Sequence, residues 1–259
     1  AHARQHAESE HVDLENAQRV EIVLVPLDEG AVVHRRIADR HKLVEPALCQ
    51  HEAADVLREV AREALQPVSK AQGAVQVLRR GQEHSAAEAI AAGHATYPSF
   101  RHFFPNDELR AKILPTFFRA TVRDAVPFGS VLSAWTGDRV DAVAVWLPPG
   151  RFPWTPVRKL RATPAFLRIM MAAPRVFAPF ARFGAGVEAA HRDAPHWYLV
   201  VMSVRAERQG QGLGTALVKP ILERADRDGI TCRLETADPN NIPFYTRLGF
   251  DVIDTAFAP

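Results

Sequence analysis

Cysteines and long apolar runs are scarce in this sequence. Cys49 and Cys232 are the only two cysteines among 259 residues, and isolated thiols support neither a disulfide framework nor a zinc site. The longest apolar stretch, residues 166–187, is interrupted by three arginines and two prolines, which excludes a membrane span. No apolar segment follows a basic start, so a secretory signal is not expected. These absences predict a cytoplasmic protein that binds no metal and no membrane.

The charge is nearly balanced, with 32 basic and 30 acidic side chains and a formal net charge of +2. This balance does not predict a nucleic acid as the main partner. Residues 1–72 hold 9 basic and 13 acidic side chains, whereas residues 73–259 hold 23 and 17. The basic excess of the second part suits a polyanionic ligand, and an ordinary solvated surface explains it equally well.

Residues 1–72 are interpreted as an N-terminal extension of unknown function, and residues 73–259 as the main domain. Within the extension, Val20 to Leu27 predicts a short strand, and the apolar spacing from Leu57 to Leu65 predicts an amphipathic helix. His2 and His6 lie four residues apart, but a polar terminus offers a metal no fixed geometry, so solvated histidines are the better interpretation. The extension is either a regulatory or interaction segment or an overlong start of the reading frame.

Strands and helices are predicted to alternate from residue 74 onward. The expected strands are residues 74–79, 129–136 and 139–146, and the expected helices are residues 85–95 and 108–125. Ser85 is predicted to cap the first helix, and Pro115 to kink or split the second. Residues 151–195 carry six aromatic residues among Arg and Pro, which suggests short helices forming a lid; ordinary core aromatics are the alternative.

A glycine-rich loop between a strand and a helix is the strongest signal. Trp197 to Val204 predicts the strand, residues 209–214 (Gln-Gly-Gln-Gly-Leu-Gly) form the loop, and residues 215–228 predict the helix. Backbone N–H groups of such a loop and the helix N-terminus together hold a pyrophosphate. The Rossmann spacing fails, because Thr215 or Leu217 stands where a third Gly or Ala is needed, and no Gly-Lys-Ser or Gly-Lys-Thr of a P-loop occurs.

The loop resembles the acetyl-CoA loop of the GNAT N-acetyltransferase superfamily in the spacing of Gln209, Gly212 and Gly214. A second part of the signature follows a predicted strand at residues 232–236, where Tyr245 stands before Gly249-Phe250. The resemblance extends over about residues 74–259. The runs that look most like the puromycin N-acetyltransferase branch and its bacterial relatives are Trp197-Tyr198-Leu199, Leu234-Glu235-Thr236 and Asn241-Ile242-Pro243-Phe244-Tyr245.

The resemblance implies an α+β (mixed α/β) fold, the GNAT fold, in which helices flank a twisted mixed, mostly antiparallel sheet. The last strand is predicted at residues 251–257, and the family sheet normally closes with one more. The sequence stops at Pro259, so either the end is missing or another segment replaces that strand. Our hypothesis is that Val20 to Val25 of the extension fills that edge.

The resemblance also implies direct transfer of an acetyl group from acetyl-CoA, the cosubstrate, to an amine. Backbone N–H groups at Met202 to Val204 would polarise the thioester carbonyl. Tyr245 would protonate the departing thiolate, because a phenol with a pKa of about 10 keeps its proton at neutral pH; a buried structural tyrosine is the alternative. Glu235 is the candidate base, and an ordinary strand-end carboxylate is its alternative. The residues expected to bind acetyl-CoA are Met202, Ser203, Val204, Gln209, Gly210, Gln211, Gly212, Leu213, Gly214, Thr215 and Asn241.

One departure from the family concerns the loop before Tyr245. Many members have an Asn seven residues before the tyrosine, whereas this chain has Asp238. Asn241 is therefore expected to contact the pantetheine instead.

Three functions remain open. The first is acetylation of a small-molecule primary amine by a monomer or homodimer, favoured because the aromatic segment 151–195 could wall an apolar pocket. The second is acetylation of a protein lysine or N-terminus, which an open groove would favour. The third is a catalytically silent acyl-CoA-binding module, with the extension as its docking segment.

Overall fold

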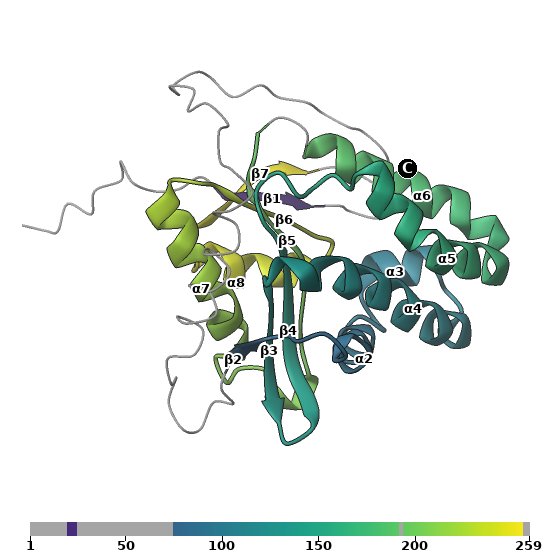
Figure 1. The fold of residues 1–259 in the computed structure, drawn as a ribbon, viewed down its shortest axis with the longest axis horizontal. Helices are drawn as coiled ribbons and strands as arrows, with labels where there is room; N and C mark the ends of the chain where they lie inside the picture. The colour runs from purple at the N-terminus through teal and green to yellow at the C-terminus, as the bar shows by residue number, and fades with distance from the viewer. Residues whose placement is uncertain (1–19, 25–74, 192–193, 256–259) are drawn as a thin grey trace, which may run out of the picture.

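A seven-stranded mixed sheet runs through the computed structural model, which describes residues 20–24, 75–191 and 194–255 (Figure 1). The strand order is β2-β3-β4-β5-β6-β1-β7. The strands are β1 (Val20–Leu24), β2 (Val75–Val77), β3 (Val131–Thr136), β4 (Arg139–Leu147), β5 (Trp197–Val204), β6 (Cys232–Thr236) and β7 (Phe250–Thr255). The pairs from β2 to β5 are antiparallel, and the pairs from β5 to β7 are parallel. The predicted mixed sheet is confirmed.

Helices cover both faces of this sheet (Figure 1). They are α2 (Glu83–Gly93), α3 (Pro98–Phe103), α4 (Asp107–Ala125), α5 (Pro156–Ala172), α6 (Pro174–Ala190), α7 (Leu213–Asp228) and α8 (Ile242–Thr246). In β4, Ala144 and Trp146 pack toward α7, whereas Val143 and Val145 pack toward α2 and α4. This alternation follows from the period of two in a strand that is buried on both faces. Each large side chain buried in this way contributes roughly 1.5–3 kcal/mol to folding.

A third layer of helices stands beyond α2 and α4. Its core consists of Phe103, Phe104, Ile113, Ile169, Ala173 and Phe180, contributed by α3 to α6 and the residues next to them. The prediction of short helices in residues 151–195 was wrong, because α5 and α6 have 17 residues each. Prolines at their first positions start these helices without loss of a hydrogen bond, since the first N–H groups of a helix have no partner within it.

Strand β1 lies inside the sheet. It pairs in parallel with β6, where Ile22 is opposite Leu234, and with β7, where Ile22 is opposite Val252. The expectation that this segment fills the edge beyond the last strand was therefore wrong, because β7 itself forms the edge. The physical reason is the crossover through α8, which returns β7 parallel to β6 and leaves a gap of one strand between them.

Two expectations about helix ends also changed. Helix α2 begins at Glu83, two residues before Ser85, so Ser85 does not cap it. The side chains of Gln82 and Glu83 accept hydrogen bonds from the N–H groups of the preceding turn at 2.8 Å, which fixes the earlier start. Helix α4 is not split but continues through Pro115, and its N-terminus is capped by Asn106. The helix predicted at Leu57 to Leu65 lies outside the described residues.

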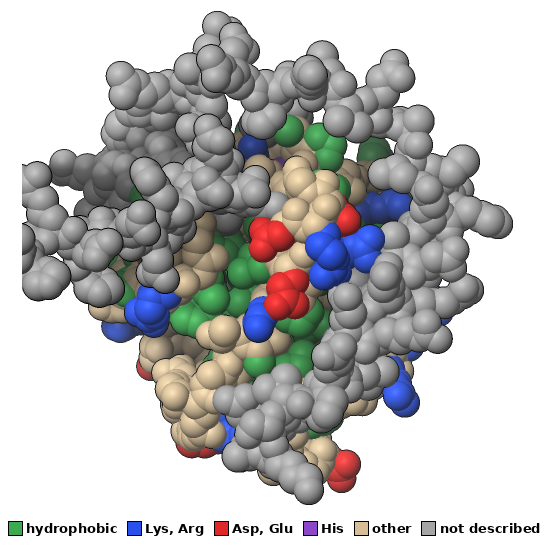
Figure 2. Space-filling view, turned by 90° about the vertical axis from the view of Figure 1, so that its left-hand side faces the viewer, with side chains coloured by type: hydrophobic (Ala, Val, Ile, Leu, Met, Phe, Trp, Pro, Cys, Tyr) green, Lys and Arg blue, Asp and Glu red, His purple; other side chains and the backbone are tan. Residues whose placement is uncertain are grey.

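The surface carries charges of both signs. On the side of the molecule shown in Figure 2, basic and acidic side chains surround exposed hydrophobic groups. None of the helices in the described part of the chain combines the length and apolarity that crossing a bilayer requires.

Hydrogen exchange tests the position of β1. An interior strand has its N–H groups bonded alternately to two neighbours, so every amide from Glu21 to Leu24 should exchange slowly. The edge strand β7 should show slow exchange only at the amides that face β1. Protection at alternate amides of β1 would indicate an edge strand, and rapid exchange throughout β1 would contradict the pairing altogether.

Substitution of Gly93 tests the close approach of α2 to β5. A Cβ at Gly93 would lie 2.1 Å from Ser203 Oγ, so Gly93→Ala should destabilise the fold by about 1–3 kcal/mol. In a Ser203→Ala background the nearest atom to the added Cβ is the Cβ of residue 203, at 3.4 Å. Urea denaturation should then show that most of the loss in stability has disappeared. Gly186→Ala, with nothing within 4 Å of the added Cβ, is the matched control. An equal cost in both backgrounds would contradict the packing.

Candidate active site

The glycine loop joins the end of β5 to the start of α7. Gly210 and Gly212 have φ angles of 72° and 79°, a backbone conformation that favours glycine. Gly212 stands at the N-cap, so the first N–H groups of α7 are free to face a ligand. The Gln209 side chain donates to the Val204 carbonyl at 3.1 Å and ties the loop to β5.

Gly214 lets α7 approach α8 closely. A Cβ at Gly214 would lie 3.2 Å from Phe244 Cζ and 3.8 Å from Met202 Cε. A larger residue would therefore push against the segment that carries Tyr245. The loop and the tyrosine are thus held together by direct packing, although they lie far apart in the sequence.

Strands β5 and β6 separate after Leu199. Their pairing covers Trp197, Tyr198 and Leu199 only, so within the described residues the second half of β5 has no strand partner on that side. An irregularity at Val145 and Trp146 of β4 leaves Val200 as an extra residue on β5. Beyond it, Met202 packs toward α7, while Ser203 is turned toward α2, where its Oγ donates to the Ala89 carbonyl at 3.4 Å.

The register of β5 determines where its free N–H groups point. Arg205 N–H donates to the Asp141 carbonyl of β4 at 2.9 Å, and backbone groups alternate sides along an antiparallel strand. The N–H groups of Val204 and Met202 consequently point away from β4, toward the gap beside β6. Two donors thus line the gap at the position that sequence reasoning assigned to polarisation of the thioester carbonyl.

Tyr245 lies on α8 at the same gap and is 7% exposed. Burial raises the pKa of its hydroxyl well above the ordinary value, with a smaller contribution from Tyr97. Phe244 and Phe250 pack against its ring, with centroid distances of 5.1 and 5.5 Å. The hydroxyl is therefore protonated throughout the neutral range and available as a proton donor.

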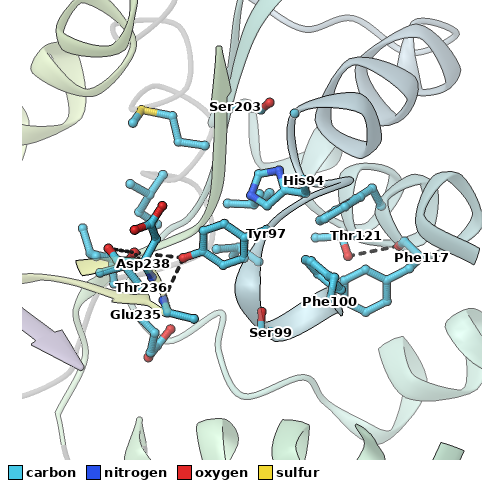
Figure 3. Close-up of a pocket in the computed structure, with 18 of the residues that line it drawn as sticks. His94, Tyr97, Ser99, Phe100, Phe117, Thr121, Ser203, Glu235, Thr236 and Asp238 are labelled. Atoms are coloured by element: carbon cyan, nitrogen blue, oxygen red, sulfur yellow. Dashed lines mark hydrogen bonds between the residues drawn. The ribbon is translucent and has the colours of Figure 1, made fainter. Parts of the chain in front are cut away.

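Tyr97 holds the loop before Tyr245 in place, which sequence reasoning missed. Its hydroxyl lies 2.8 Å from Thr236 Oγ1 and accepts a hydrogen bond from Ala237 N–H at 2.7 Å (Figure 3). The Asn241 side chain donates through Nδ2 to the same Thr236 oxygen at 3.1 Å. Its side-chain oxygen, Oδ1, takes no part in this hydrogen bond. No local sequence pattern could have shown this contact, because Tyr97 and Thr236 are 139 residues apart.

Glu235 lies at the end of β6 and is bound on both carboxylate oxygens. Tyr198 Oη donates to Oε2 at 2.7 Å, and His191 Nε2 contacts Oε1. Burial and the charge of Glu235 raise the pKa of Tyr198 well above its ordinary value. The candidate base is thus a fixed, partly buried carboxylate. No sequence motif pointed to His191 or to the role of Tyr198.

His94 is a buried neutral imidazole at the other end of the site. Its Nδ1 donates to the Ile90 carbonyl at 2.9 Å, and the rings of Tyr97, Phe100 and Phe118 surround it (Figure 3). Burial lowers its pKa to about 4, against a smaller opposing effect of the Ile90 carbonyl. His94 therefore carries no charge at neutral pH.

A single cavity of about 1350 Å³ brings these groups together. The expected site residues that line it are Met202, Ser203, Val204, Gln209, Gly210, Gly212, Leu213, Gly214, Thr215, Glu235, Asn241 and Tyr245. Gln211 does not line it; its side chain donates to the Glu207 carbonyl at 3.1 Å. The opposite wall comes from α3 to α6 and the segment before α5, with Phe100, Phe117, Phe152, Trp154, Phe166 and Phe177.

Neither a metal centre nor a reactive thiol is found among residues 75–191 and 194–252, whose side chains are described. No group of three or more His, Cys, Asp or Glu side chains there could hold a metal ion. Burial raises the pKa of the Cys232 thiol to about 12, so this thiol is protonated at neutral pH and is a weak nucleophile.

Comparison with known proteins finds sequence similarity in the part of the chain that carries the glycine loop. The sequence model of the Acetyltransferase (GNAT) family matches residues 177–250, which include β5, the loop, α7, β6 and Tyr245. An uncharacterized N-acetyltransferase of Schizosaccharomyces pombe is 37% identical over 59 residues, which are 23% of this chain. The match spans about a quarter (24%) of that relative's length.

Two solved structures show a distant likeness. A Corynebacterium glutamicum protein described as histone acetyltransferase HPA2 and related acetyltransferase has 18% identity and a TM-score of 0.49, over 68% of this chain and 83% of its own. Arylalkylamine N-acetyltransferase 2 of Aedes aegypti has 15% identity and a TM-score of 0.43, over 68% and 81%. Residues 177–250 therefore carry the sequence pattern of the GNAT acetyltransferase family, and they lie in a mixed sheet that is flanked by helices.

The pKa of His94 predicts how stability depends on pH. Its folded pKa of about 4 lies below the ordinary 6.5, so the unfolded chain binds more protons between these values. The free energy of unfolding should be highest above pH 6.5 and fall by about 3 kcal/mol as the pH decreases to 4. His94→Phe removes the titrating ring and should flatten this slope, as measured by urea denaturation. The Ile90 carbonyl should stay bonded in the variant, because the backbone N–H of residue 94 still donates to it.

The exposed His84 offers a matched control. Its side chain is 62% exposed, so His84→Gln should leave the pH slope as it is in the parent protein. If His94→Phe and the parent protein lose stability in parallel between pH 6.5 and 4, burial of a neutral His94 is contradicted.

Proposed function

We propose that this protein transfers the acetyl group of acetyl-CoA to the primary amine of a small molecule. The observation that carries the proposal is the shared cavity, which joins the glycine loop and Tyr245 to an aromatic wall. Each part suits one piece of the reaction. The loop suits the pyrophosphate, the gap beside β5 suits the thioester, and the aromatic wall suits the body of the acceptor.

The fit to CoA is supported by backbone groups of the glycine loop and the helix that follows it. The helix start at Leu213 offers free N–H groups behind glycines that leave room for phosphate oxygens. Beside it, the unpaired edge of β5 runs along the cavity. An extended pantetheine, which carries amide groups, would complete the hydrogen bonds that β6 does not make there.

Direct transfer follows from the chemistry of the lining residues. The acceptor amine attacks the thioester carbonyl, whose oxygen the N–H groups of Met202 and Val204 would stabilise; such donors contribute roughly 3–4 kcal/mol to lowering a barrier. The C–S bond then breaks, and Tyr245 gives its proton to the sulfur. The attached nitrogen loses its extra proton, which restores the Tyr245 hydroxyl and leaves the neutral amide. A covalent route through Cys232 is disfavoured, because that thiol has a pKa of about 12.

The acceptor is proposed to be a small amine rather than a protein lysine. Helices α5 and α6 wall the cavity with aromatic side chains, whereas a protein substrate needs an open groove for its backbone. Glu235, Glu188 and Asp238 also line the cavity and would attract a cationic amine. Aminonucleosides such as puromycin combine an amine with flat aromatic rings, so we include this branch of acceptors in the proposal.

Turnover measurements test the proposal. Release of CoA from acetyl-CoA should be seen with at least one member of a panel of aminonucleosides, arylalkylamines, polyamines, aminoglycosides and peptides. Tyr245→Phe should lower kcat about 100-fold or more while CoA binding by calorimetry stays the same, because only proton donation is removed.

Leu160→Ala is the control. Leu160 is 70% exposed and stands outside the cavity, so its loss should change neither turnover nor binding. Equal turnover by the parent protein and Tyr245→Phe would refute the role of Tyr245. CoA binding without turnover across the whole panel would instead favour a silent acyl-CoA-binding module, and preference for peptides would favour a protein acetyltransferase.

A further inference from the structure

A line of hydrogen-bonding groups leads away from the cavity behind Glu235. The carboxylate contacts His191 Nε2, His191 Nδ1 lies 2.6 Å from His196 Nε2, and His196 Nδ1 lies 2.7 Å from the Ala194 carbonyl. Both histidines are buried, at 3% and 4% exposed, and neither lines the cavity. Glu235 lines the cavity at one end of the line, and Ala194 is exposed at the other.

Counting protons shows that these groups depend on one another. The line has three contacts, and each needs one hydrogen. A carbonyl can only accept, so His196 Nδ1 must carry a hydrogen. Two neutral imidazoles supply two hydrogens and an ionised carboxylate supplies none. One additional proton is therefore needed to complete all three bonds.

The position of this additional proton is not fixed by the heavy atoms. It can reside on His196, on His191 or on Glu235, and in each case the three contacts stay bonded when the other hydrogens shift along the line. Counted over Glu235, His191 and His196 alone, the line with its proton has no net charge, which suits buried groups. Without the proton it has a net negative charge, and two lone pairs face each other at one contact. The line without the proton is accordingly a ready proton acceptor.

We propose that Glu235, His191 and His196 share one proton, and that this chain takes up the proton that the acceptor ammonium loses before attack. In this step an N–H bond of the ammonium breaks, its electron pair stays on the amine, and a new bond to hydrogen forms on Glu235. The hydrogens then shift toward His196. The two histidines act through Glu235 and are positioning residues. This inference rests on the proposed function, because it concerns the same site.

Other charged and titratable groups lie close to this line and have partners of their own. Tyr198 of β5 donates to the second oxygen of Glu235. Arg233 of β6 donates to the Ala190 carbonyl, next to His191, at 3.3 Å. Glu188 of α6 is paired with Lys159 of α5 at 2.5 Å. The Phe152 ring packs edge-on against His191 at 5.1 Å and helps to exclude water.

Nitrogen NMR of the imidazoles tests the shared proton without any turnover. The two rings should change in one common step as the pH is varied, because the proton belongs to the chain rather than to one residue. His196 Nδ1 should remain protonated on both sides of that step. Two independent titrations, or an unprotonated His196 Nδ1, would overturn the shared proton.

The pH dependence of kcat/KM tests the catalytic part. In His191→Gln the amide can still donate to Glu235 but cannot hold or pass on a proton. We expect kcat/KM to fall about tenfold or more, and its acid limb to move to lower pH, because the variant has lost the ring that shares the proton with Glu235. His102→Gln, at an exposed histidine on α3, should leave the profile unchanged.

The outcomes separate this inference from the proposed function. A profile in His191→Gln that is lower but has its acid limb at the parent pH would indicate a structural role and overturn the inference. Absence of turnover with every amine would refute the proposed function, and with it the catalytic part, while the NMR titration would still decide whether the proton is shared.

Discussion

The separation of β5 from β6 after Leu199 is the constraint on which the rest of the site depends. A strand in the interior of a sheet normally has its N–H and C=O groups bonded on both sides. In the part of the chain that the structure describes, the second half of β5 has a neighbouring strand on one side only. The extra residue at Val200 then sets which groups face the gap, so the N–H groups of Met202 and Val204 point into it. An extended ligand can bond where a strand is missing, and the glycine loop lies at the end of that same gap.

Buried polar side chains hold the two sides of the gap at a fixed spacing. Tyr97 links the start of α3 to the end of β6 through Thr236 and Ala237. Tyr198 and His191 both contact the Glu235 carboxylate and fix it near the end of β6. Burial keeps His94 uncharged and Tyr245 protonated at neutral pH. The site therefore places the Glu235 carboxylate near neutral donors, which suits removal of a proton from an amine next to donation of another to a thiolate.

The parts of the site that sequence reasoning found are those with a local pattern. Gly210 and Gly212 could be identified from the sequence because their backbone angles need glycine. Strands β5 and β6 could be identified because their apolar runs are buried on both faces. The roles of His191 and Tyr97 could not be identified from the sequence, since their partners lie 44 and 139 residues away. The position of β1 was predicted wrongly for a similar reason: a short apolar strand indicates pairing but not which neighbours it pairs with.

The most direct test of the account is amide NMR during titration with CoA. If CoA lies in the gap, the largest shifts should occur at Met202, Val204 and the first residues of α7 from Leu213 to Thr215, with the amides of the β3–β4 hairpin unchanged. Shifts confined to surfaces away from β5 and α7, with these amides unaffected, would contradict the claim that the gap between β5 and β6 is the acetyl-CoA site.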